Sequence, residues 1–231
     1  MTTVIAVQGD GFSAVCVDSR ISDIDDSGYT SQVFTLREGN CKVAINGKYL
    51  LGAAGDMRAI NILHHVFQPP TPPLNLRGKK LDEFMTAKFI PALRECFEQQ
   101  GYASPDSNEE KKHIAEQDST ILVSIHGSIY IIDGDYSWAS DASGIYALGT
   151  GSSYALGALN VLVGKKKMSI LHAKQITTKA ISTAAKFDPH TGFPYHWFVQ
   201  EAETQEKIIV KKSRKKTIKK QGIVKKQGRK I

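Results

Sequence analysis

Apolar and β-branched residues dominate the first part of the chain in short runs of strand length. Residues 3–7 (TVIAV) and 12–20 (FSAVCVDSR) are two such runs, and the QGDG between them supplies the residues of a tight turn. The polar stretch 22–32 predicts a loop. Two further runs, 41–46 (CKVAIN) and 49–55 (YLLGAAG), predict a second pair of strands joined by a Gly-Lys turn. The chain is therefore expected to begin with strands.

The spacing of apolar positions changes to the helical period from Asp56 onward. The proline-rich stretch 69–73 (PPTPP) ends this first helix, and a second helix begins near Leu81. Pro91 is expected to kink or split the second helix, because proline lacks a backbone N–H group. The apolar residues on one face are Ile60, Leu63 and Phe67 in the first helix, and Met85, Phe89, Leu93 and Cys96 in the second.

The second half of the chain repeats this alternation of strands and helices. Residues 119–137 predict a hairpin that turns at its central His-Gly pair. Residues 154–163 and 169–186 have the apolar spacing of two helices, and a last pair of strands is expected within 193–210. This order of elements fits two sheets layered between helices, an α+β fold with αββα layers.

We expect one domain over residues 2–210, followed by a basic tail over residues 211–231. From Lys207 to Ile231 there are twelve Lys or Arg and no Asp or Glu, out of 30 basic residues in the whole chain. The rest of the chain has 18 basic and 23 acidic residues, so its net charge is negative. The net charge of +7 for the whole chain is therefore due to the tail. Such a tail either binds nucleic acid or an acidic partner, or is a solvated appendage.

The rest of the composition is ordinary for a globular protein, with 41% hydrophobic and 23% charged residues in 231. No apolar run has the length of a membrane span, and the start lacks the features of a signal peptide. The three cysteines, Cys16, Cys41 and Cys96, are scattered and odd in number. They indicate reduced thiols, so we expect a cytoplasmic location without membrane attachment.

Common catalytic and cofactor motifs are not found in the sequence. His64 and His65 are adjacent and cannot face one point from a helix, and no Cys or His pair has the spacing of a zinc site. The GTGSS segment (149–153) lacks the lysine of a phosphate-binding loop, and no G-x-S-x-G motif is present. We therefore predict neither a metal nor a cofactor.

The first two residues raise another kind of chemistry. Met1 precedes Thr2, which is small enough for the start methionine to be removed, and removal places a free α-amine beside the threonine hydroxyl. Such an amine titrates near about pH 8 and is able to act as the base for the hydroxyl. A lysine held by an anion would lower the pKa of the amine, and a glycine N–H would bind the oxyanion. Asp18, Lys42 and Gly55, near the ends of predicted strands, are candidates for these parts.

Several motifs then follow in order: TTVIAV (2–7), DSR (18–20), KV (42–43), YLLGAAG (49–55), ALGTGSSYALGAL (147–159) and FDPHTG (187–192). On these motifs the chain resembles the proteasome β-subunit family, including the bacterial HslV peptidases, from Thr2 to about Val210. The resemblance implies the four-layer αββα sandwich of the N-terminal nucleophile hydrolase type. It also implies subunits that assemble into stacked rings around a proteolytic chamber.

The resemblance implies roles for the residues near the start of the chain. Thr2 matches the nucleophile, and Asp18 matches the aspartate that orients the catalytic lysine. Lys42 matches that lysine, and Arg20 matches an arginine that supports the site. Ser22 falls at the position whose backbone pairs with the substrate.

Later residues complete the implied site. Gly55 matches the glycine whose N–H forms the oxyanion hole. Ser152 matches a serine that hydrogen-bonds near the threonine amine, and Asp188 matches the aspartate that supports this amine. Thr191 stands where most members have serine, and Gly192 follows as expected.

The chain also departs from the family pattern. The stretch between Ile21 and Lys42 is longer than in the family, and it contains residues that line the specificity pocket there. Lys48 is a second candidate for the catalytic lysine, but it lies in a polar turn, so Lys42 is favoured. Ala53, at the expected pocket floor, is small and would leave room for a large side chain.

The resemblance implies a threonine-type endopeptidase that cleaves polypeptides within homo-oligomeric rings of six or seven subunits. An ATP-dependent unfoldase is an implied partner. Three alternatives stay open: an N-terminal nucleophile amidase that acts on small amides, a non-catalytic ring or scaffold subunit, and a nucleic-acid-binding module organised by the tail. The direct start on a strand favours a β-type subunit over the α-type, which carries an extra N-terminal helix.

Overall fold

The computed structural model describes residues 2–24, 28, 30–37, 39–74, 76–105, 115–164 and 167–202, and every structural statement below concerns these residues. Three expectations fall outside them: removal of Met1, the strand expected near residues 207–210, and the basic tail at 211–231 with its boundary at 210. Within the described ranges, no helix combines the length and the apolar character needed to cross a bilayer.

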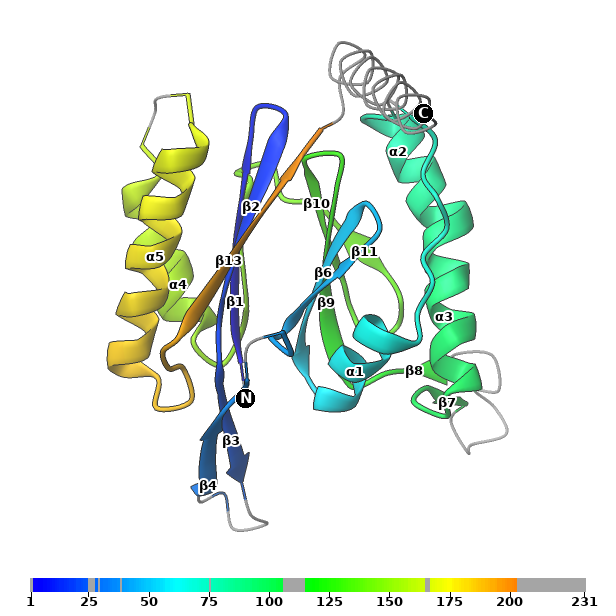
Figure 1. Cartoon of the computed structure of the whole chain (residues 1–231). Helices are drawn as coiled ribbons and strands as arrows, with labels where there is room; N and C mark the ends of the chain where they lie inside the picture. The colour runs from blue at the N-terminus through cyan, green and yellow to red at the C-terminus, as the bar shows by residue number, and fades with distance from the viewer. Residues whose placement is uncertain are drawn as a thin grey trace, which may run out of the picture.

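Two antiparallel sheets lie face to face at the centre of the molecule (Figure 1). The strands of the first sheet are, in spatial order, β12 (Ile145–Gly149), β1 (Thr3–Gly9), β2 (Phe12–Asp18) and β13 (Tyr195–Glu201). Those of the second are β11 (Trp138–Ala139), β10 (Ser128–Ile132), β9 (Ser119–Ile125), β6 (Tyr49–Gly55) and β5 (Val43–Asn46).

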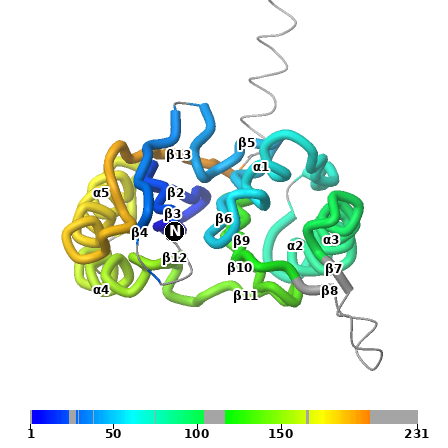
Figure 2. Tube along the Cα trace, turned by 90° about the horizontal axis from the view of Figure 1, so that it is seen from below, coloured from blue at the N-terminus to red at the C-terminus, as the bar shows by residue number. Residues whose placement is uncertain are grey.

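Helices cover the outer face of each sheet, which gives four layers (Figures 1 and 2). The helices over the first sheet are α4 (Ser152–Leu162) and α5 (Ile170–Phe187). Those over the second are α1 (Met57–His65), α2 (Lys79–Phe84), the π-helical segment η1 (Met85–Phe89) and α3 (Ile90–Gln99). The predicted αββα fold class is confirmed.

Alternation along the strands produces the layers. In β1, Val4 packs between the two sheets while its neighbour Ile5 packs against α4 and α5. In β9, Leu122 packs between the sheets while Ile121 and Val123 face the helices on the other side. Each central strand is thus buried on both faces, which explains why the strands are continuous apolar runs in the sequence.

The polar stretch 22–32, predicted as a loop, instead contributes to a hairpin. β3 (Arg20–Ile24) pairs with β4 (Thr30–Thr35) in a two-stranded ribbon that projects beyond both sheets (Figure 1). The residues of β4 are exposed on both faces. A ribbon that covers no core needs no apolar alternation, so the hydrophobic pattern contains no signal for it.

Pro91 neither splits nor ends its helix. The chain runs from α2 through η1 into α3 without a break, and Pro91 lies in the first turn of α3. A proline ring clashes with the carbonyl four residues earlier, here that of Ala87, which lies in the π-helical segment. The wider π turn accommodates this clash, so the expected disruption occurs as a local change of helix type.

Two smaller features complete the comparison with the sequence. The β9–β10 hairpin turns at His126 and Gly127, as the sequence predicted, and their φ angles of 51° and 79° are those of a type I′ turn. The strand β12 was not predicted. Another short pair consists of β7 (Ser104–Pro105) and β8 (Ala115–Glu116).

The layered core makes a direct prediction about stability. Leu122 is fully buried between the sheets, whereas Val161 on α4 is 80% exposed. Leu122→Ala should lower the free energy of unfolding by about 2–5 kcal/mol, because it leaves a cavity. Val161→Ala, the matched control, should change it by less than about 0.5 kcal/mol. Urea unfolding of both variants measures the two values, and equal losses would contradict the assignment of Leu122 to the core.

Candidate active site

Thr2 lies directly before β1 and is only 4% exposed. Its carbonyl oxygen accepts a hydrogen bond from the backbone N–H of Thr150, at 3.0 Å. Gly149, at the end of β12, has a φ of +88°, and a Cβ atom there would lie 2.6 Å from the Thr2 carbonyl carbon. Only glycine allows the chain to pass so close to Thr2. The end of β12 therefore fixes the position of the first residue of the candidate site.

The carboxylate of Asp18, at the end of β2, connects several parts of the site. Its Oδ1 accepts hydrogen bonds from the backbone N–H of Thr3 at 2.9 Å and from Nζ of Lys42 at 2.7 Å. Its Oδ2 accepts from the backbone N–H groups of Arg20 at 3.0 Å and Gly192 at 3.1 Å. Asp18 and Lys42 are both fully buried. The lysine ammonium thus shares one oxygen with the N–H group of the Thr2–Thr3 peptide bond.

Lys42 has a second acceptor, the carbonyl oxygen of Arg20, at 2.5 Å from Nζ. Burial holds the pKa of Lys42 below its ordinary value of 10.5, and the charge of Asp18 offsets part of this effect. The rival candidate Lys48 lies at the other end of β6 from Gly55, roughly 20 Å away at the rise of a strand. Of these two lysines, the structure brings only Lys42 to the site.

A second carboxylate, that of Asp188, lies directly after α5. Its Oδ2 accepts hydrogen bonds from the hydroxyls of Thr150 at 2.8 Å and Thr191 at 2.6 Å. Thr191 has one hydroxyl proton, which goes to Asp188, so the 2.6 Å bond between the Thr191 and Thr3 hydroxyls is donated by Thr3. The backbone N–H of Gly151 donates to the Thr3 hydroxyl at 3.2 Å. This chain of hydrogen bonds connects Asp188 to the residue next to Thr2.

Arg20 and Gly192 hold the segment after α5 in place. The Arg20 guanidinium donates a hydrogen bond from Nη1 to the carbonyl oxygen of Pro189, at 2.7 Å. A Cβ atom at Gly192 would lie 2.6 Å from Cζ of Arg20, so the glycine is needed for this contact. The predicted supporting role of both residues fits this geometry.

A cavity of about 390 Å³ opens beside Thr2. Its walls come from the ends of three strands and the residues next to them: Thr2, Ala54, Gly55, Thr120, Gly149 and Thr150. Gly55 has a φ of +128°, and a Cβ atom there would lie 2.7 Å from the hydroxyl oxygen of Ser119. The backbone at Gly55 therefore borders the cavity in a conformation that suits glycine.

The side chains of three of the predicted residues lie outside this network and do not line the cavity. Ser152 is the first residue of α4, and its side chain has no hydrogen bond to another described residue. Ser22 is buried in β3, and its hydroxyl likewise has no partner within the described part of the chain. Ala53 faces the helix layer, whereas its neighbour Ala54 lines the cavity beside Thr2.

Sequence reasoning missed two residues, Thr3 and Thr150. The hydroxyl of Thr150 bonds to Asp188 from a position two residues before Ser152, within the same GTGSS segment. That segment offers three hydroxyls, and only the strand end at Gly149 shows which of them points to the site. No sequence motif marked Thr3 as a site residue, because a threonine at the start of a buried strand is common.

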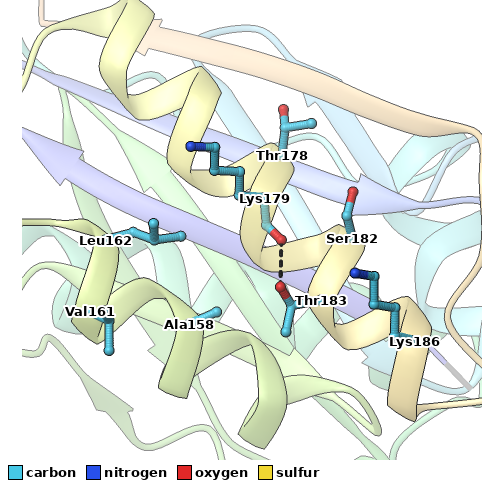
Figure 3. A pocket seen from close by; sticks show the side chains of 8 residues that line it. All are labelled: Ala158, Val161, Leu162, Thr178, Lys179, Ser182, Thr183 and Lys186. Atoms are coloured by element: carbon cyan, nitrogen blue, oxygen red, sulfur yellow. Dashed lines mark hydrogen bonds between the residues drawn. The ribbon is translucent and has the colours of Figure 1, made fainter.

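A second hollow, of about 570 Å³, lies between α4 and α5 (Figure 3). Aliphatic side chains of α4 form one wall, and lysines and hydroxyl side chains of α5 form the other. The hydroxyl of Thr183 already donates to the Lys179 carbonyl oxygen, at 2.9 Å. None of the residues in the hydrogen-bond network around Asp18 and Asp188 lines this hollow. Across the described residues, no group of three or more His, Cys, Asp and Glu is placed to hold a metal ion.

Comparison with solved structures places this fold. The chain matches BPH (bacterial proteasome homologue) of Thiobacillus denitrificans, solved in complex with epoxomicin, at a TM-score of 0.66 and 19% identity, over 88% of this chain and 100% of that one. A second structure of the same protein matches at 0.64 and 20% identity. A eukaryotic HslV from Trypanosoma brucei matches at 0.55 and 18% identity, over 87% of this chain and 99% of that one.

The chain has the fold of BPH and HslV. At these low identities the similarity shows a shared fold. The resemblance noted in the sequence is confirmed for the fold. No family model matches the chain, and no match is found among curated proteins. The roles of individual residues therefore depend on the geometry of the site.

The close approach at Gly149 can be tested by adding one methyl group. Gly149→Ala should lower the free energy of unfolding by about 2–4 kcal/mol, because alanine is strained at this φ and overlaps the Thr2 carbonyl group. Gly157→Ala is the matched control: Gly157 lies in α4, with no atom within 4 Å of an added Cβ, and the change should stabilise by about 0.5–1 kcal/mol. Chemical unfolding that shows a neutral Gly149→Ala would refute the tight contact.

Burial of Lys42 predicts a specific pH dependence of stability. Between the lowered pKa of the folded chain and the ordinary 10.5, the unfolded chain binds a proton on this lysine that the folded chain does not. The free energy of unfolding of the wild type should therefore rise with pH through this interval relative to Lys42→Met. Urea unfolding of both proteins at successive pH values up to 10.5 measures the difference. Parallel profiles would show that the pKa of Lys42 is not lowered.

Proposed function

We propose that this protein is a threonine-type endopeptidase whose nucleophile is Thr2, exposed by removal of Met1. The observation that carries the proposal is the shared carboxylate oxygen of Asp18, which accepts from both Lys42 and the backbone N–H of Thr3. This arrangement places a buried cation next to the start of β1. A cation at this position would lower the pKa of a free α-amine on Thr2 and stabilise its alkoxide.

The first step forms an acyl-enzyme. The Thr2 hydroxyl oxygen attacks the peptide carbonyl carbon, and its proton passes to the α-amine of the same residue. The backbone N–H of Gly55 would stabilise the tetrahedral oxyanion. When the intermediate collapses, the carbon–nitrogen bond breaks and the amine returns the proton to the leaving nitrogen. The product is an ester between Thr2 and the acyl part of the substrate.

The second step releases the acyl part. A water molecule attacks the ester carbon while the α-amine takes one of its protons. The bond to the Thr2 oxygen then breaks, and the proton moves to that oxygen to restore the hydroxyl. Asp188, through the hydroxyls of Thr150, Thr191 and Thr3, would hold the residues around Thr2 in place during both steps.

Assembly and partners are further parts of the proposal. The fold shared with BPH and HslV supports homo-oligomeric rings that enclose the site and admit unfolded polypeptides. An ATP-dependent unfoldase that delivers substrate, an acidic or nucleic-acid partner for the tail and a cytoplasmic location stay predictions. One of the similar structures binds epoxomicin, so the same compound is a suitable probe of the site in this chain.

Replacement of the nucleophile tests the catalytic proposal. Thr2→Ala should abolish cleavage of an unstructured protein substrate such as casein, whereas Thr2→Ser should retain part of it, because serine keeps both the hydroxyl and the amine. Initial rates by fluorescence, with thermal melting as the control for folding, give the result. Equal cleavage by the wild type and Thr2→Ala would contradict the proposal. Turnover of small acyl amides without cleavage of peptides would favour an amidase.

Mass measurements test the processing and assembly on which the site depends. Denaturing mass spectrometry should show loss of Met1, and native mass spectrometry should show a multiple of the subunit mass. Thermal melting with and without epoxomicin should show stabilisation of the wild type and a smaller shift for Thr2→Ala. An assembled ring that retains Met1 would indicate a non-catalytic subunit instead.

A further inference from the structure

Thr120 is the second residue of β9, and its side chain points between the two sheets. Its neighbour Ser119 faces the other way, where its hydroxyl contacts the Tyr102 hydroxyl at 2.7 Å and accepts from the Asp56 N–H at 3.1 Å. Successive side chains of a strand alternate, so Thr120 shares the inner face with Leu122. On the neighbouring strand β6 it stands directly opposite Ala54.

Thr120 is one of the residues that line the cavity beside Thr2. No other described residue makes a hydrogen bond to its hydroxyl. Two more threonines line the cavity, Thr2 and Thr150. The hydroxyl of Thr150 donates its proton to Asp188. Thr120 therefore presents a half-buried hydroxyl, able to donate and to accept, to whatever occupies the cavity.

The position of the cavity indicates what this occupant is. None of the described residues that line it belongs to β3, the strand whose Ser22 is expected to pair with the substrate chain. The cavity lies beside Thr2, between the ends of β6, β9 and β12. If the acyl part of the substrate lies along β3, the leaving amine departs into this space. Water then enters the space that the amine has left.

We propose that Thr120 binds the water molecule that hydrolyses the acyl-threonine ester. This proposal rests on the proposed function and deepens it. The water donates one hydrogen bond to the Thr2 α-amine and the other to the Thr120 hydroxyl oxygen, so that its lone pair faces the ester carbon. The water oxygen bonds to this carbon, the first proton moves to the amine, the bond to the Thr2 oxygen breaks, and that oxygen takes the proton from the amine.

The two steps can be separated with 4-nitrophenyl acetate, which releases coloured 4-nitrophenolate on acylation. Thr120→Val keeps the shape of the side chain and removes the hydroxyl, and Thr120→Ser is the matched control that keeps the hydroxyl. The burst of 4-nitrophenolate reports acylation of Thr2, and the later steady rate reports hydrolysis. The background from other nucleophiles is measured with Thr2→Ala and subtracted, and thermal melting checks the fold of each variant.

For Thr120→Val we expect an unchanged burst and a steady rate lower by roughly tenfold, the effect of one lost hydrogen bond in the transition state. Intact mass spectrometry should then find acetyl-enzyme, and peptide mapping should place the acetyl group on Thr2. Thr120→Ser should behave as the wild type.

Two outcomes would overturn the proposal while leaving Thr2 as nucleophile: an unchanged steady rate in Thr120→Val, or an equal loss in Thr120→Ser. A burst slowed in parallel with the steady rate would instead assign Thr120 to acylation and also overturn it. A wild type that shows neither a burst nor a steady release above that of Thr2→Ala would overturn the proposed function as well. If Thr120→Val melts well below the wild type, Thr120→Ala is judged by the same two rates.

Discussion

The buried ion pair between Lys42 and Asp18 is the interaction on which the rest of the site depends. Both side chains are fully shielded from solvent, and a buried charge without its partner is destabilising by about 3–5 kcal/mol. The pair is tolerable because its remaining hydrogen-bonding capacity is used: the carboxylate accepts from three backbone N–H groups as well, and the ammonium donates to a backbone carbonyl. Those backbone groups belong to segments far apart in the chain. Satisfying one carboxylate therefore brings β1, β3 and the segment after α5 to one point.

Glycine makes the close approaches around that point possible. Gly149 lies against the Thr2 carbonyl group, Gly192 lies against the Arg20 guanidinium, and Gly55 lies against the start of β9. At each place a Cβ atom would overlap a neighbour, and at Gly149 and Gly55 the positive φ also disfavours any other residue. The backbone segments of the site thus lie close together, and Thr2 is held through its carbonyl oxygen, which accepts a hydrogen bond from the backbone N–H of Thr150.

Two carboxylates act on Thr3, the first residue of β1. Asp18 holds the backbone N–H of Thr3, while Asp188 reaches the Thr3 hydroxyl through Thr191. Thr3 is therefore fixed by both its backbone and its side chain. Thr2, the proposed nucleophile directly before it, lines the cavity together with Gly55 and Thr120.

The sequence by itself determined the layers, and it proposed most of the residues of the candidate site. Strands buried on both faces must be apolar throughout, and helices over a sheet must repeat their apolar residues, so the αββα order could be predicted from the pattern. The order of the motifs pointed to Thr2, Asp18, Lys42, Gly55 and Asp188. Only the tertiary structure showed that Thr150 donates a hydrogen bond to Asp188 and that residues 22–32 contribute to an exposed hairpin, and only it revealed Thr3 and Thr120. Hydrophobic periodicity reports which side of an element is buried, whereas a hydrogen bond between distant strand ends depends on register and on a single turn at Gly149. These are properties of the folded chain that no local stretch of sequence contains.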